Sequence, residues 1–143
     1  MNVDSFKARL IAATGAKGLS WKEYDEYKGE GAHIYSEISL PNFDEVLLLL
    51  FLYKDSMEVI FKLDAVRENE DTLRLVNDFN QNTTYFKSFI QRERNRNILY
   101  VACNVIHLPN EEAGVNAFMD IMNTINSDSV NTYLRPLTII AKP

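Results

Sequence analysis

The run from Phe43 to Tyr53 constrains the fold of this chain more than any other segment. Alternate side chains of an extended strand point to opposite faces, so Leu47, Leu49 and Phe51 share one face. The other face carries a second apolar set, which consists of Val46, Leu48, Leu50 and Leu52. Both faces of this strand therefore need cover, which is typical of a strand in the interior of a sheet.

Two arrangements satisfy this two-sided pattern, and periodicity alone leaves both of them open. In the first arrangement, helices lie on both sides of the sheet, or the sheet curls around its own core. In the second, one apolar face stays uncovered and binds a partner protein or a second copy of the chain. Under the second arrangement, we place the partner-binding residues at Val46, Leu48, Leu50 and Leu52.

The neighbouring segments alternate between helical and extended patterns. In chain order we first expect a helix around Phe6 to Thr14, capped by Asp4 or Ser5, and then three strands at His33 to Leu40, Phe43 to Tyr53 and Met57 to Ala65. A helix at Glu68 to Asn82 follows, and after it come two strands at Thr84 to Gln91 and Asn97 to His107. The next helix starts after Pro109-Asn110 and reaches Ile125. The stretch from Trp21 to Gly31 is expected to be a loop with at most one strand, and Ser127 to Arg135 adds a helical turn or two.

This order, α-β-β-β-α-β-β-α, predicts an α+β protein with a mainly antiparallel five-stranded sheet and helices packed on it. At 143 residues the chain fits one domain that spans residues 1–143. A hydrophobic fraction of 46% excludes disorder as the main state.

Composition also excludes several classes of function. A net charge of −5 argues against direct binding to nucleic acid, because neutralising phosphates needs clustered Lys and Arg. The longest apolar run has eight residues, well short of the roughly 20 that a membrane-spanning helix needs. With a single cysteine and no signal peptide pattern, we expect a reducing, cytoplasmic compartment.

A search for catalytic chemistry finds no supported site. Cys103 and His107 share a strand face, but four residues along a strand separate them by about 13 Å, too far for a thiol and its base. Cys103 is interpreted as a buried structural thiol, and His33 has no companions with metal-ligand spacing. We therefore predict no enzymatic activity, no catalytic residues, no cofactor and no metal.

Charged stretches support one alternative function. The acidic residues Glu23, Asp25, Glu26 and Glu30 are read first as solvated surface, as are the arginines Arg92, Arg94 and Arg96 in a turn. Alternatively, the acidic surface mimics nucleic acid and inhibits a basic nucleic-acid-binding target, as in a phage or mobile-element accessory protein.

The layout of the second half of the chain carries a family resemblance. The run Leu75-Val76-Asn77-Asp78-Phe79-Asn80 leads into a strand at Tyr85-Phe86-Lys87 and another at Ile98-Leu99-Tyr100-Val101. Together with the element order, this resembles the YbjN family and the wider type III secretion chaperone-like fold over nearly the whole chain. The segments Trp21 to Gly31 and Val130 to Pro143 do not match that pattern.

The resemblance implies a protein that binds other proteins, often as a homodimer, and it brings no catalytic residues with it. Combined with the two-sided strand, it leads to one functional hypothesis. The chain is expected to be a small chaperone-like or regulatory module that holds a protein partner through an apolar sheet face or edge, as a homodimer.

Overall fold

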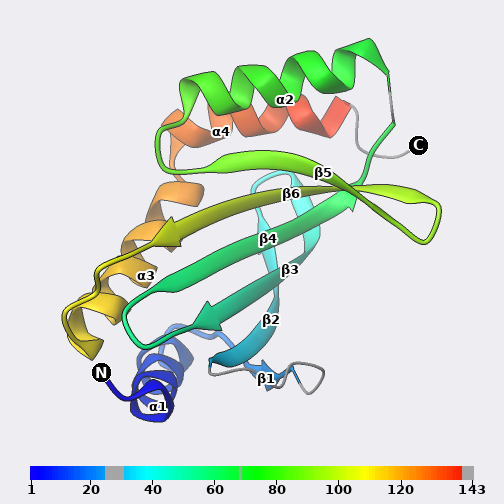
Figure 1. Cartoon of the computed structure of the whole chain (residues 1–143). Coiled ribbons are helices and arrows are strands. Elements are labelled where there is room, and N and C mark those ends of the chain that lie inside the picture. Colours follow the sequence, from blue (N-terminus) through cyan, green and yellow to red (C-terminus); the bar gives the residue numbers. More distant parts are fainter. Residues whose placement is uncertain (25–30, 68, 140–143) are drawn as a thin grey trace.

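The chain folds into a six-stranded antiparallel sheet whose main core lies on one face, beneath helices (Figure 1). The computed structural model describes residues 1–24, 31–67 and 69–139. In chain order the elements are α1 (Val3–Gly15), β1 (Lys22–Glu23), β2 (Ala32–Leu40), β3 (Phe43–Leu52), β4 (Met57–Ala65), α2 (Glu70–Asn82), β5 (Lys87–Glu93), β6 (Arg96–Val105), α3 (Glu111–Ile125), α4 (Asp128–Leu134) and the 3-10 helix η1 (Arg135–Ile139).

The strand order is β1-β2-β3-β4-β6-β5, and all neighbours are antiparallel. Helix α2 connects β4 to β5, and β6 returns between these two strands. The predicted α+β class and antiparallel sheet are confirmed. The sixth strand, β1, lies in the stretch Trp21 to Gly31, where at most one strand was expected, and it was not counted among the five because it pairs with β2 over only two residues, too few to produce a periodic pattern.

Asparagine side chains begin three of the helices, because their Oδ1 atoms accept bonds from otherwise unpaired backbone N–H groups. Asn2 accepts from the N–H of Ser5 at the start of α1, so the predicted caps Asp4 and Ser5 both lie inside that helix. At the starts of α2 and α3, the caps are Asn69 and Asn110. The helix predicted after Pro109-Asn110 is therefore confirmed, with Asn110 as its cap.

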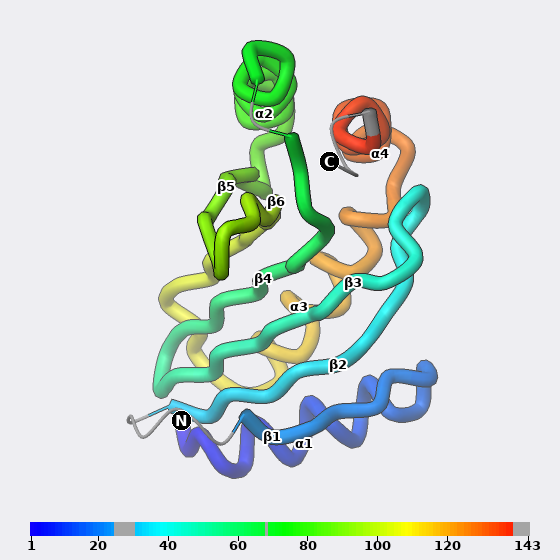
Figure 2. Tube along the Cα trace, turned by 90° about the vertical axis from the view of Figure 1, so that its right-hand side faces the viewer, coloured from blue at the N-terminus to red at the C-terminus, as the bar shows by residue number. Residues whose placement is uncertain are grey.

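The main core fills the space between one face of the sheet and the helices. Figure 1 shows the sheet in front of α3, and Figures 1 and 2 both show α1 below the sheet and α2 and α4 above it. Five phenylalanines are fully buried, and they come from α1, β4, α2, the segment before β5, and α3: Phe6, Phe61, Phe79, Phe86 and Phe118. The opposite face of the sheet is covered by no helix that the structure describes.

The β5 edge of the sheet is closed near the start of that strand by a side chain from α2. The Oδ1 atom of Asn80 accepts from the backbone N–H of Ser88 at 2.6 Å, and its Nδ2 atom donates to the Ser88 carbonyl at 3.0 Å. One carboxamide thus forms the pair of bonds that a neighbouring strand would form, so this part of the edge cannot pair with another chain.

Candidate functional site

The structure places the predicted partner-binding residues in the core. Val46, Leu48, Leu50 and Leu52 are each 2% exposed or less and belong to the main hydrophobic cluster. They point toward the helices, so they do not line an accessible surface of the folded chain. The face of β3 that no described helix covers carries the other set of alternating residues, Leu47, Leu49 and Phe51.

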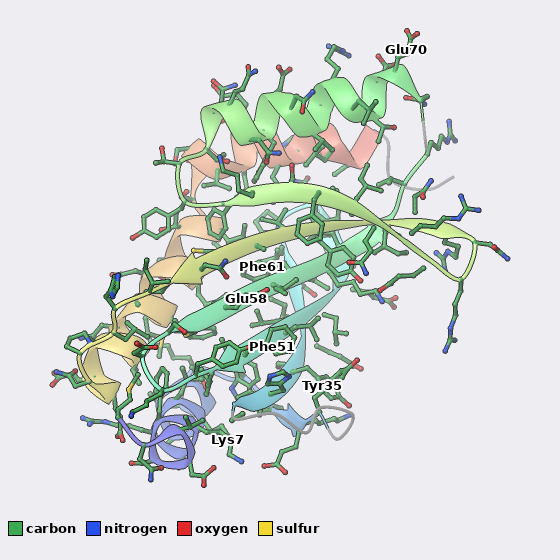
Figure 3. All side chains as sticks on the ribbon, in the orientation of Figure 1. Lys7, Tyr35, Phe51, Glu58, Phe61 and Glu70 are labelled. Atoms are coloured by element: carbon green, nitrogen blue, oxygen red, sulfur yellow. The ribbon has the colours of Figure 1, made fainter. Side chains whose placement is uncertain are left out.

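We define the open-face strip as the half-buried apolar residues that this uncovered face presents on three adjacent strands. The strip consists of Tyr35 on β2, Leu47, Leu49 and Phe51 on β3, and Ile60 on β4. The three β3 residues belong to neither buried cluster. In the strand register, Leu49 lies directly between Tyr35 and Ile60. Figure 3 shows Tyr35 and Phe51 on their neighbouring strands.

A second patch of the same face, toward β5, is built from an aromatic stack and an ion pair, with Tyr100 buried beneath Phe89, which is 38% exposed. The Tyr100 ring stacks on Phe89 at 5.3 Å and is itself only 6% exposed. The Tyr100 hydroxyl donates to Glu93 at 2.6 Å, and Lys62 Nζ lies 2.9 Å from the same carboxylate. Both bonds hold the pKa of Glu93 below its usual range, with Tyr100 the larger cause. Burial, followed by the bond to Glu93, raises the pKa of Tyr100. The charges of this patch are therefore internally compensated.

His33 extends the apolar character of the strip. Its ring lies 4.2 Å from that of Phe51 and 6.1 Å from that of Tyr53, measured between centroids. Burial lowers the pKa of His33, which favours the neutral imidazole near pH 7. His33, for which the sequence shows no companions with metal-ligand spacing, is thus part of an aromatic group beside the strip.

Acidic side chains border the strip. Glu37 and Glu58 lie in register with Leu47 and Phe51, and Glu45 precedes Leu47 by two residues on β3. A shallow hollow of about 610 Å³ opens at this end, between the β2–β3 hairpin residues Glu37 to Ser39 and Asp44 to Leu47. The residue-by-residue pairing of β3 with β4 ends at Leu47 and Lys62, so the two strands separate there. The strip therefore ends in an acidic depression.

The structure gives no support to Cys103 and His107 as a catalytic pair. Cys103 faces the core and is 5% exposed, whereas His107 lies after β6, is exposed, and has a left-handed backbone with φ of 59°. Burial raises the pKa of the Cys103 thiol to about 11. Among the described residues, no group of three His, Cys, Asp or Glu side chains could hold a metal ion.

The buried thiol leads to a direct prediction. Cys103 is expected to react with a thiol reagent at pH 8 at least about a hundredfold more slowly in the folded protein than in urea, because only the thiolate is nucleophilic and burial disfavours it. Stopped-flow absorbance with a disulfide reagent measures both rates. Equal rates would place the thiol at the surface.

The charged residues singled out from the sequence lie away from the strip or outside the described part of the chain. Asp25, Glu26 and Glu30 lie outside the described residues, and Glu23 pairs with Lys7 at 2.6 Å. The arginines Arg92, Arg94 and Arg96 are exposed at the β5–β6 hairpin, where Arg94 and Asn95 have the left-handed backbone of a tight turn. These positions agree with solvated surface.

Comparisons with known proteins identify the fold. No protein-family model matches the sequence, and no curated protein matches it significantly. The crystal structure of YbjN from E. coli, described as a candidate transcription regulator, superposes with a TM-score of 0.60 and 18% sequence identity over 96% of each chain. The predicted resemblance to YbjN is therefore confirmed at the level of the fold. No helix in the described part of the chain has the length and apolar character needed to cross a membrane.

Proposed function

We propose that this protein is a non-enzymatic protein-binding module, chaperone-like or regulatory, and that the open-face strip is its binding surface. A single observation carries the proposal: five apolar side chains lie together on a sheet face that no described helix covers. Contiguous apolar surface of this kind is typical of protein interaction sites, because its exposure to water is unfavourable and a bound partner removes it from water.

The fold likeness to YbjN supports a regulatory version of this function. YbjN is described as a candidate transcription regulator. The present chain has a net charge of −5, and exposed acidic residues border the strip, so contact with a phosphate backbone would be repulsive. A regulatory role would therefore act through a protein partner rather than through direct binding to DNA.

Two further parts of the proposal concern the location of the protein and its oligomeric state. A cytoplasmic location agrees with a lone cysteine that is free and buried. A homodimer is proposed on the family resemblance alone, and sedimentation equilibrium over a range of concentrations measures it directly. A mass equal to one chain at all concentrations would remove the homodimer from the proposal.

The binding surface is tested with one variant in the strip and one matched control. Leu49→Asp places a charge at the centre of the strip, and Leu73→Asp makes the same change at a leucine of α2 that is 65% exposed. Each tagged protein is used to capture partners from native lysate, and the affinity of the captured partner is then measured. We expect Leu73→Asp to match the wild type and Leu49→Asp to bind about thirtyfold more weakly, the loss typical of a central interface residue. A folded Leu49→Asp protein with wild-type affinity would contradict the proposal.

The alternative function, inhibition of a basic nucleic-acid-binding target by an acidic surface, has its support in the net charge of −5. The same capture separates the two functions by salt. Binding that is lost between about 50 and 300 mM salt and is unaffected by Leu49→Asp would favour the acidic inhibitor, since exposed charges are screened within about 10 Å at 0.1 M.

A further inference from the structure

The position of the strip within the sheet restricts what kind of segment can occupy it. Strand β3 is an interior strand, and the backbone groups of its residues 47–52 face β2 on one side and β4 on the other. An occupant of the strip can therefore contact side chains but finds no strand edge to pair with. Because buried backbone N–H and C=O groups need partners, the occupant must satisfy its own, as an α-helix does.

The length and shape of the strip suit a helix laid along β3. From Leu47 to Phe51 the strip runs about 14 Å, at about 3.4 Å per residue. This equals about two and a half helical turns, which present apolar side chains at positions i, i+4 and i+7. Tyr35 and Ile60 flank Leu49 on the adjacent strands. The apolar stripe of an amphipathic helix can thus contact all three strands.

The charges around the strip favour a basic helix. Glu37, Glu45 and Glu58 border the strip, and none of them forms an ion pair with a residue that the structure describes. The adjacent cation, Lys62, is already paired with Glu93 at 2.9 Å. Of the other lysines of this face, Lys22 on β1 pairs in register with Tyr35 and so adds one positive charge beside the strip, against the three carboxylates, whereas Lys87 on β5 lies farther out, beside Ala102. The border next to the strip therefore carries net negative charge.

We propose that the open-face strip binds a basic amphipathic α-helix of a partner protein, with the apolar stripe of that helix on Leu47, Leu49 and Phe51 and its Lys or Arg side chains beside Glu37, Glu45 and Glu58. This inference rests on the proposed function and specifies the partner of the same surface. Electrostatic complementarity at the rim selects the partner, and the apolar contacts supply the affinity.

The test uses two synthetic helical peptides of about 18 residues, long enough for about five turns. Both carry leucine at helical spacing i, i+3, i+4 and i+7. One has lysine at the remaining positions, and its counterpart has glutamate there. Fluorescence anisotropy measures the affinity of each labelled peptide for the full-length protein. We expect the lysine peptide to bind at least about tenfold more tightly than the glutamate peptide, from several rim contacts of opposite sign.

Charge-reversal variants locate the effect at the strip. Glu37→Lys/Glu58→Lys is compared with Asp78→Lys/Asp120→Lys, which makes the same change in net charge at exposed positions of α2 and α3. We expect the first pair to weaken binding of the lysine peptide about tenfold and the second to change it less than about twofold. In ¹⁵N-labelled protein, the amide shifts that move on binding should include Leu47 to Phe51.

Each of the other outcomes would overturn the inference. The first is that the glutamate peptide binds as tightly as the lysine peptide, and the second is that the two charge-reversal pairs have equal effects. The third is a wild-type dimer that Leu49→Asp converts to a monomer, because this would assign the strip to a second copy of the chain. The proposed function fails separately. If a native partner needs Leu49 but is indifferent to Glu37→Lys/Glu58→Lys, the protein-binding function stands and only the basic helix is excluded.

Discussion

Replacing Leu50 with aspartate is expected to unfold the protein at 25 °C, whereas Leu49→Asp, one residue away, leaves it folded. Leu50 is fully buried, and Leu49 lies on the uncovered face. Loss of a buried leucine costs about 2 to 5 kcal/mol, and an unpaired carboxylate in the core adds several more. The sum is comparable with the whole stability of a domain, about 5 to 15 kcal/mol. Circular dichroism with urea titration measures both variants.

Leu49→Asp is expected to cost less than about 2 kcal/mol, because its carboxylate can reach water. The contrast between neighbouring positions is the useful result, since both substitutions make the same chemical change on the same strand. Cooperative unfolding of Leu50→Asp near the wild-type midpoint, or loss of structure in Leu49→Asp, would mean that the two faces of β3 are assigned the wrong way round.

Gly114→Ala is expected to destabilise the protein by about 1 to 3 kcal/mol, although alanine is the better helix former by about 1 kcal/mol. Gly114 lies in α3 where the Phe6 ring of α1 packs against it. A Cβ atom at this position would lie 2.4 Å from Phe6 Cζ and 2.5 Å from Phe6 Cε1. The Phe6 side chain is fully buried and can move only by disturbing its neighbours. Urea denaturation measures the change in the free energy of unfolding.

Gly15→Ala is the matched control for this prediction. No atom lies within 4 Å of the Cβ that it would add at the end of α1. We expect its effect on the free energy of unfolding to stay within about 1 kcal/mol. If Gly114→Ala were as stable as Gly15→Ala, the close packing of the Phe6 ring of α1 on Gly114 of α3 would not contribute to the stability of the fold.

The element order was predictable because the local signals were strong. The alternation of Met57, Val59 and Phe61 with Glu58 and Lys62 identified β4, and the stripe along α3 identified that helix. β1 was too short to leave a pattern. The β-bulge between Lys62 and Asp64 was not foreseen, and it places Ala65 opposite Ile98 on the uncovered face rather than in line with Phe61.

Which apolar face of β3 lies open was not predictable from that strand alone, since both alternating sets are equally apolar. The missing signal was the cross-strand register of the β3–β4 hairpin. Glu58 and Lys62 on β4 pair with Phe51 and Leu47, so the polar face of β4 and the odd-numbered face of β3 are the same. Leu52 pairs with Met57, so the connecting loop has four residues, 53–56, and this register places Leu48 and Leu50 on the buried face with Val59 and Phe61. The predicted strands, which end at Tyr53 and resume at Met57, imply a loop one residue shorter and would have given the opposite face.

The candidate site depends on features that no local pattern encodes. The part of the uncovered face toward β5 is occupied by Phe89 stacked on Tyr100 and by Lys62 paired with Glu93. These residues are separated by up to 38 positions in the sequence, as between Lys62 and Tyr100, and only the sheet order brings them together. The strip is therefore the part of the face that remains after these tertiary contacts form.

The central claim is that the open-face strip contacts the partner, and site-specific photo-crosslinking in cells tests it most directly. A benzophenone amino acid replaces Tyr35, whose aromatic ring already lies in the strip, and in a second protein it replaces the exposed Leu73 of α2. The account predicts a crosslinked protein adduct from position 35 that Leu49→Asp abolishes, and no such adduct from position 73. An adduct from position 73 alone, or one from position 35 that persists in Leu49→Asp, would contradict it.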